Sequence, residues 1–179
     1  MLTPGWRNLA GISLALVAAG CGMFGGPKVP QHPCPRAGIL KDAQRLTKFL
    51  PGPGRDLTDV VFQVQLADVR TQCIYGTSGV RIDMLVDIAA ERGPADKSRK
   101  AVFAYFVAIS NPAGTILARE RFTALIPFIP NVSRALAVEE LEQMIPLPRG
   151  RSAENYRIIV GLQVTREELE FNRRPRQRR

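Results

Sequence analysis

Hydrophobic and polar residues alternate along several segments of this chain of 179 residues. In "VRIDMLVDIAA" (80–90) the apolar side chains share one face and polar ones the other, and the same alternation recurs in "VVFQVQLADV" (60–69) and "YRIIVGLQVT" (156–165). A period of two with a polar outer face is typical of a half-buried strand. The predicted inward residues are Val60, Phe62, Val64, Leu66, Val80, Ile82, Met84, Val86, Ile88, Tyr156, Ile158, Val160, Leu162 and Val164.

The segment "AVFAYFVAI" (101–109) is apolar on both faces, which predicts a central strand. It ends in "NPAG", where Asn111, Pro112 and Gly114 suit the first, second and fourth places of a type I turn. The chain then returns through "TILARERFTAL", so we expect a hairpin over 101–124. The segment "TQCIYGTSG" adds a short strand before a glycine-rich turn.

Two segments fit more than one element. "GILKDAQRLTKFL" (38–50) has apolar residues at helical spacing, but it fits an entering strand and a loop equally well. "ALAVEELEQMIPL" (135–147) supports a helix through Val138, Leu141 and Ile145, whereas its position before the last strand supports a strand and a crossing loop.

The last strand is followed by "TREE", in which Thr165 and Glu168 have the spacing of a capping box. We therefore expect one or two helical turns over 166–172. With six or seven strands and no long helix between them, the sequence predicts an all-β antiparallel sandwich over 39–172. Its length and strand count are similar to those of immunoglobulin-like or fibronectin type III-like domains, although the Cys-Trp-Cys signature of true immunoglobulin domains is absent.

Composition is that of an ordinary globular protein, with 45% hydrophobic and 23% charged residues, but the formal net charge is +9. Five arginines of the final "RRPRQRR" account for most of this excess and, together with Arg7 of residues 1–20, leave only +3 for residues 21–172. A nucleic-acid-binding domain needs a basic folded face, so we predict no nucleic-acid partner. The five are Arg173, Arg174, Arg176, Arg178 and Arg179.

The N-terminus carries an apolar run from Leu9 to Gly20 that contains no charge. Twelve residues are too few to span a bilayer, which needs about 20. The run fits the apolar region of a secretory signal peptide. The alternative, a buried N-terminal helix of a cytosolic protein, is disfavoured because a Gly/Pro-rich stretch after Cys21 would disconnect it from a core.

The run ends in "AAGC" (18–21), which resembles the lipobox of bacterial lipoproteins, with Ala18 where leucine is usual. This resemblance implies that 1–20 is a signal peptide and that Cys21 becomes the lipidated first residue of the mature chain. Residues 21–38 would then form a Gly/Pro-rich tether. Because Gly22 and not aspartate follows the cysteine, the resemblance implies the outer membrane, facing the periplasm.

With Cys21 lipidated, Cys34 and Cys73 remain. In an oxidising periplasm we expect them to form one disulfide, and two separate buried thiols are the alternative. The bond would close a loop of about 40 residues and stabilise the fold by about 3–4 kcal/mol.

The sequence predicts no catalytic residue, no metal site and no cofactor. The single histidine, His32, lies in the tether, and we find no His–Cys cluster, phosphate-binding glycine loop or Ser–His arrangement. Asp83 and Asp87 share a strand face about 13 Å apart. That is too far for a glycosidase pair, which needs at most about 9.5 Å, so we expect both to lie on a solvated face with Arg81.

Two features are candidates for binding. In "ALIPFIP", two prolines separate apolar residues, which either plug the core at a crossover between sheets or form an exposed patch for a partner. The apolar residues are Leu125, Ile126, Phe128 and Ile129. The arginine-rich segment 173–179 is either a solvated, disordered tail or a contact to phospholipid, lipopolysaccharide or peptidoglycan anions.

Together these patterns predict a lipid-anchored envelope protein with a non-catalytic structural or adaptor role. It would attach to the membrane through its lipid and bind another envelope component, namely a protein, lipopolysaccharide or peptidoglycan. The alternatives are a small carrier or chaperone for an apolar ligand and an envelope enzyme of unknown type.

Overall fold

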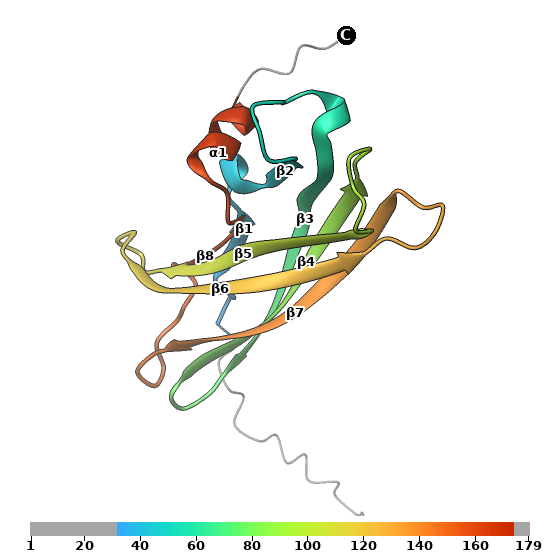
Figure 1. The fold of residues 1–179 in the computed structure, drawn as a ribbon. Coiled ribbons are helices and arrows are strands. Elements are labelled where there is room, and N and C mark those ends of the chain that lie inside the picture. The colour runs from blue at the N-terminus through green and yellow to red at the C-terminus, as the bar shows by residue number, and fades with distance from the viewer. Residues whose placement is uncertain (1–31, 174–179) are drawn as a thin grey trace, which may run out of the picture.

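Two four-stranded sheets pack face to face in the computed structural model of the chain, which describes residues 32–173 (Figure 1). Sheet A has the order β1 (Arg36–Ile39), β8 (Arg157–Leu162), β5 (Lys100–Ser110) and β6 (Ile116–Pro127). Sheet B has the order β2 (Arg45–Phe49), β3 (Val60–Tyr75), β4 (Gly79–Arg92) and β7 (Arg134–Pro146). The predicted all-β sandwich is confirmed, with eight strands and one parallel pair, β1 with β8.

The core lies between the sheets and is built by the predicted alternation. Val80, Ile82 and Met84 of β4 are buried, as are the alternate residues of β3 from Val60 to Leu66. The strand β5 lies between β8 and β6, so its central position is confirmed. A register shift between Leu66 and Asp68 moves the inward positions of β3, because an extra residue on one strand reverses the faces beyond it.

Neither of the two ambiguous segments is an α-helix. Residues 38–50 end β1, form the short 3-10 helix η1 (Lys41–Ala43) and enter β2, so the continuous helix is wrong. Residues 135–147 pair with β4 in antiparallel register over nearly all of β7, so the strand alternative is correct there. Pairing with a neighbour decides both cases, because the backbone groups of these residues gain partners in a ladder.

The predicted hairpin and crossover are confirmed. The amide of Gly114 donates to the carbonyl of Asn111 at 2.9 Å and closes the turn between β5 and β6. After Pro127 the chain leaves the edge of sheet A and enters β7 at the edge of sheet B. The amide of Phe128 donates to the carbonyl of Arg99 at 2.8 Å and holds the crossover at its start.

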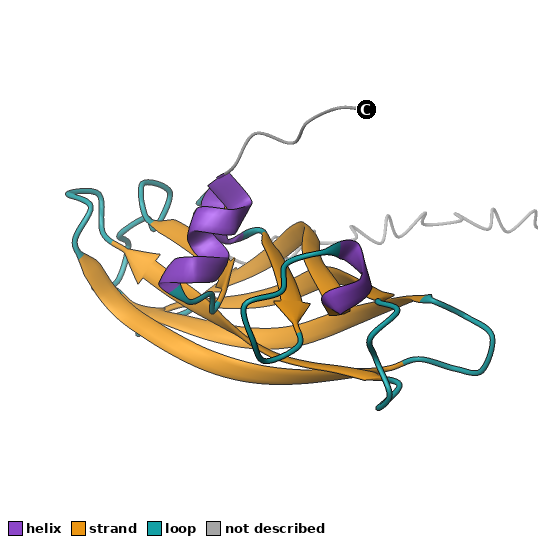
Figure 2. Ribbon diagram, turned by 45° about the horizontal axis from the view of Figure 1, so that its top comes forward, coloured by secondary structure: helices purple, strands orange, loops and turns teal. Residues whose placement is uncertain are grey.

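One end of the sandwich holds the helix α1 (Arg166–Arg173) and the second 3-10 helix η2 (Leu57–Asp59). The capping box is confirmed, since the Thr165 and Glu168 side chains accept from each other's backbone amides at 3.2 and 2.8 Å. The Asn172 amide donates to two carbonyls near η1, and the ring of Phe171 packs against Phe49 at 5.2 Å. Figure 2 shows α1 lying outside the strand layers.

The other end is joined where the described chain begins. Cys34 and Cys73 form a disulfide, as predicted, which joins the segment before β1 to β3 of the other sheet. The Tyr75 hydroxyl donates to the carbonyl of Pro33 at 2.7 Å and accepts from the amide of Ala153 at 3.1 Å. Three segments distant in sequence are therefore held together beside the disulfide.

Candidate functional site

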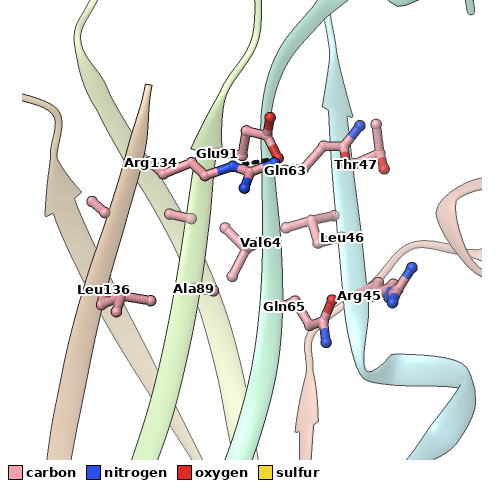
Figure 3. A pocket seen from close by; sticks show the side chains of 12 residues that line it. Arg45, Leu46, Thr47, Gln63, Val64, Gln65, Ala89, Glu91, Arg134 and Leu136 are labelled. Atoms are coloured by element: carbon pink, nitrogen blue, oxygen red, sulfur yellow. Dashed lines mark ion pairs between the residues drawn. The ribbon is translucent and has the colours of Figure 1, made fainter. Parts of the chain in front are cut away.

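The outer face of sheet B carries the most distinctive surface of the described chain. One hollow of about 450 Å³ crosses all four strands of the sheet, as Figure 3 shows. At its centre is Ala89 of β4, flanked by Gln65 of β3 and Leu136 of β7. The surface dips there because the alanine methyl group is shorter than its cross-strand neighbours.

The rim of this hollow is polar on three sides. Arg134 and Glu91 lie directly opposite each other on β7 and β4 and form an ion pair at 3.6 Å. Arg45 approaches from β2 beside Gln65 of β3, and Gln63 of β3 lies next to Thr47 of β2 (Figure 3). Amides, a guanidinium and an apolar wall suit contact with a peptide backbone and an apolar side chain better than covalent chemistry.

A second hollow of about 580 Å³ lies farther along the same face. Its outward residues come from β3, β4 and β7, and they are Arg70, Gln72, Asp83, Leu85, Glu140 and Glu142. Most of them are charged, so this hollow is more acidic than the first.

Charges on the outer face of sheet B pair with one another. Arg70 bonds Asp87 at 2.6 Å, while the Nε of Arg81 lies 3.4 Å from Asp83 and 3.7 Å from Glu142. This matches the expectation for Asp83 and Asp87, which lie on a solvated sheet face beside arginines. The carboxylates at outward positions are Asp68, Asp83, Asp87, Glu91, Glu140 and Glu142, and the arginines are Arg45, Arg70, Arg81 and Arg134. The face is thus mildly acidic.

An apolar row on β7, which Glu140 and Glu142 interrupt, lies along the edge of this face. Leu136 is 85% exposed, and Val138 and Met144 project to the same side. An edge strand also presents backbone groups that have no ladder partner on one side. These two properties together make β7 the most evident place on the face for a partner to pack.

Polar side chains also enter the space between the sheets beside β7. The Tyr105 hydroxyl donates to Glu139 at 3.1 Å, and the Gln143 amide donates to Glu120 at 3.1 Å. Burial, the Glu139 charge and this hydrogen bond raise the pKa of Tyr105 well above its usual range. These contacts satisfy polar groups at the side of the core where β6 and β7 are edge strands.

The predicted apolar patch divides between core and surface. Ile126 and Phe128 are only 3% and 4% exposed, whereas Leu125 and Ile129 are 58% and 64% exposed. The four residues therefore do not form one exposed patch, because alternation along β6 and the crossover sends two of them inward. Ile126 at the end of β6 and Phe128 in the crossover plug the end of the core.

The remaining predicted residues lie mostly at the ends of the chain. Arg173 ends α1 and pairs with Asp42 at 2.6 Å. Cys21, Arg174, Arg176, Arg178 and Arg179 lie outside the described residues.

Sequence analysis missed the hollow around Ala89. The alternation over 60–69 implies that Gln63 and Gln65 point outward, but nothing in the sequence places Gln65 near Leu136, because 135–147 also fits a helix. Apolar and polar residues are mixed on both faces of "RALAVEELEQMIP", so its outward side could not be identified from alternation.

Within residues 32–173 no three His, Cys, Asp or Glu side chains gather as a metal site. No helix in that same range is long and apolar enough to cross a bilayer. Comparison with protein-family profiles, with curated proteins and with solved structures finds no match to this chain.

Proposed function

We propose that this chain is a lipid-anchored protein of a bacterial cell envelope that acts as a non-catalytic adaptor. The lipid is attached to Cys21, and a protein partner of the envelope binds the outer face of sheet B along β7. The mature chain faces the periplasm, and its membrane is the outer membrane.

The observation that supports the lipid anchor and the location in the envelope is the pairing of the cysteines. The chain has three cysteines, and Cys34 and Cys73 are bonded to each other. Cys21, at the end of the lipobox-like "AAGC", is therefore left as the thiol for the lipid. A structural disulfide also agrees with an oxidising compartment, since such bonds are rare in the cytosol.

The surface chemistry of sheet B favours a protein as the partner. Its six outward carboxylates would repel the phosphates of lipopolysaccharide and the carboxylates of peptidoglycan. The exposed row on β7, with Leu136 at its start, offers apolar area that polysaccharides use less well. A partner segment in extended conformation could also pair with the β7 edge.

The address is tested by the intact mass of the protein from membranes, beside a Cys21→Ala variant. We expect the mass of residues 21–179 plus acyl groups, and loss of that species in the variant. An unmodified full-length chain in the cytosol would overturn the proposal.

The adaptor role is tested by site-specific photo-crosslinking in cells, with the crosslinker at position 136 and, as the matched control, at position 123 of sheet A. We expect a discrete protein adduct from 136 only, and its loss when Cys21→Ala removes the anchor. Equal adducts from both positions would contradict a defined site. An adduct with glycan alone would point to peptidoglycan or lipopolysaccharide, and an apolar molecule retained through purification would favour a carrier.

A further inference from the structure

The outer face of sheet A has a different charge pattern from that of sheet B. Its outward positions carry five cations: Arg36 on β1, Lys100 on β5, Arg119 and Arg121 on β6, and Arg157 on β8. Among the described residues of sheet A no carboxylate faces outward, since Glu120 of β6 points toward the other sheet.

These cations have no acidic neighbour within ion-pair distance in residues 32–173. Arg119 lies over the Phe106 ring at 4.3 Å and donates to Gln163 at 3.2 Å, so its charge remains available. Arg36 and Arg157 lie opposite each other on the parallel strands β1 and β8. Like charges at facing positions destabilise a sheet, so an external anion would relieve this cost.

The same face exposes apolar side chains between its cations. Val102 of β5 and Leu125 of β6 are exposed and lie directly opposite each other. Cations mixed with exposed apolar groups are the composition that suits the head-group region of an anionic bilayer.

The described chain begins at the end of the sandwich where Cys34 is bonded to Cys73 of sheet B, and it then enters sheet A. β1 is the edge strand of sheet A, and it begins at Arg36, fifteen positions after Cys21. A chain of that length spans at most roughly 50 Å. The tether would therefore hold the face within reach of the bilayer that carries the lipid.

From these observations we propose that the outer face of sheet A binds the anionic head groups of a phospholipid bilayer. This inference rests on the proposed lipid anchor for its location, and it orients the domain. With sheet A on the membrane, the outer face of sheet B and the β7 row point away from the bilayer, toward a partner.

The test is flotation of the full chain carrying Cys21→Ser with vesicles of phosphatidylglycerol and phosphatidylcholine, or of phosphatidylcholine alone. We expect stronger binding to the anionic vesicles, which weakens as salt is raised. The variant R36Q/R121Q/R157Q should lower the partition coefficient for anionic vesicles at least tenfold. The matched variant R45Q/R70Q/R134Q removes the same charge from sheet B and should lower it less than twofold.

Equal weakening by both variants would overturn the proposal, because it would show that net charge and not this face governs binding. The absence of a preference for anionic vesicles would overturn it as well. Should the triple variant fail to fold, modification of arginines by phenylglyoxal on the unsubstituted full chain decides instead. Arg121 and Arg157 should react more slowly on anionic vesicles while Arg45 is unchanged, and unchanged reactivity at Arg121 and Arg157 would contradict the proposal.

The test is independent of the lipid. A chain that lacks acyl groups in cells but binds anionic vesicles through sheet A would contradict the anchor alone. A lipidated chain whose Cys21→Ser form ignores anionic vesicles would contradict the membrane-contact face alone.

Discussion

The outer faces of the two sheets handle charge in opposite ways. On sheet B arginines and carboxylates alternate across strands, so Arg70, Arg81 and Arg134 each reach an acidic partner. On sheet A the outward cations have no acidic neighbour in the described chain, although the inward face of each sheet follows the same apolar alternation. The two sheets therefore share one apolar core, and they differ in the charges on their outer faces.

The two faces also differ in whether their charges are paired within the molecule. Cross-strand ion pairs neutralise sheet B within the molecule, which leaves its apolar β7 row as the feature available to a partner. Sheet A has the reverse arrangement, with outward cations that have no ion-pair partner in residues 32–173. Four stability measurements test whether the faces differ as described while they share one core.

Removal of the disulfide should have the largest effect, because the bond joins the segment before β1 of sheet A to β3 of sheet B. We expect the double change Cys34→Ala and Cys73→Ala to lower the free energy of unfolding by about 4 kcal/mol. Urea denaturation under oxidising conditions measures it, with Cys21→Ala as the control that should leave stability unchanged. Equal stability of the double variant and its parent would contradict a structural role for the bond.

Two leucines of sheet B allow a comparison of the core with the outer face. Leu66 is fully buried, whereas Leu136 projects from the β7 edge. Leu66→Ala should cost about 3 kcal/mol of unfolding free energy through lost burial and a cavity. Leu136→Ala should cost less than about 0.5 kcal/mol while it weakens binding of the protein partner. A comparable loss of stability in both would mean that Leu136 is structural and not a contact residue.

Asp96 lies in the connection from sheet B to sheet A, and its side chain is buried. Burial by itself would raise the pKa of this carboxyl, but hydrogen bonds from Arg92, Ser98 and the Arg99 amide outweigh burial and lower the pKa. We expect Asp96→Asn to cost about 2 kcal/mol, because it weakens charge-assisted bonds and leaves donors unmatched.

The sign of the pH effect follows from the lowered pKa. The stabilisation that ionised Asp96 gives the fold is complete above the ordinary pKa of the unfolded carboxyl, about 3.9. It is lost as the pH falls through the lower pKa of the folded state. Denaturation of the parent and of Asp96→Asn as a function of pH should therefore converge in acid. If the difference in unfolding free energy between the parent and Asp96→Asn stays constant into strong acid, the ionised carboxylate is not the cause of that difference.

The smallest effect compares one arginine from each face. Arg70→Gln should lower unfolding free energy by at most about 0.5 kcal/mol, because it breaks an exposed ion pair with Asp87. Arg121→Gln should leave the unfolding free energy unchanged or raise it by about a few tenths of a kcal/mol, because it relieves repulsion between cations without breaking an ion pair. Thermal unfolding at low and high salt measures the difference, which should shrink with salt. A loss at Arg121 equal to that at Arg70 would reveal an acidic partner on sheet A.

Much of the fold follows from local patterns. Alternation identified the inward faces of β3, β4 and β8 because a strand directs successive side chains to opposite sides whatever its neighbours are. The turn at Asn111 and the capping box at Thr165 were also predictable, since each is a hydrogen-bond arrangement within a few residues. The pairing of Cys34 with Cys73 followed once Cys21 was assigned to the lipid.

Tertiary structure decided the features that depend on which strands are neighbours. Residues 135–147 are a strand because β4 supplies a ladder partner, and Phe128 is buried because the crossover turns it into the core. The sidedness of charge was equally beyond the sequence. Alternation places Arg36, Arg121 and Arg157 on the outer side of their own strands, but only the order β1-β8-β5-β6 brings them onto one face. The physical reason is that side-chain direction is a local property of the backbone, whereas a binding face is made by pairing between distant segments.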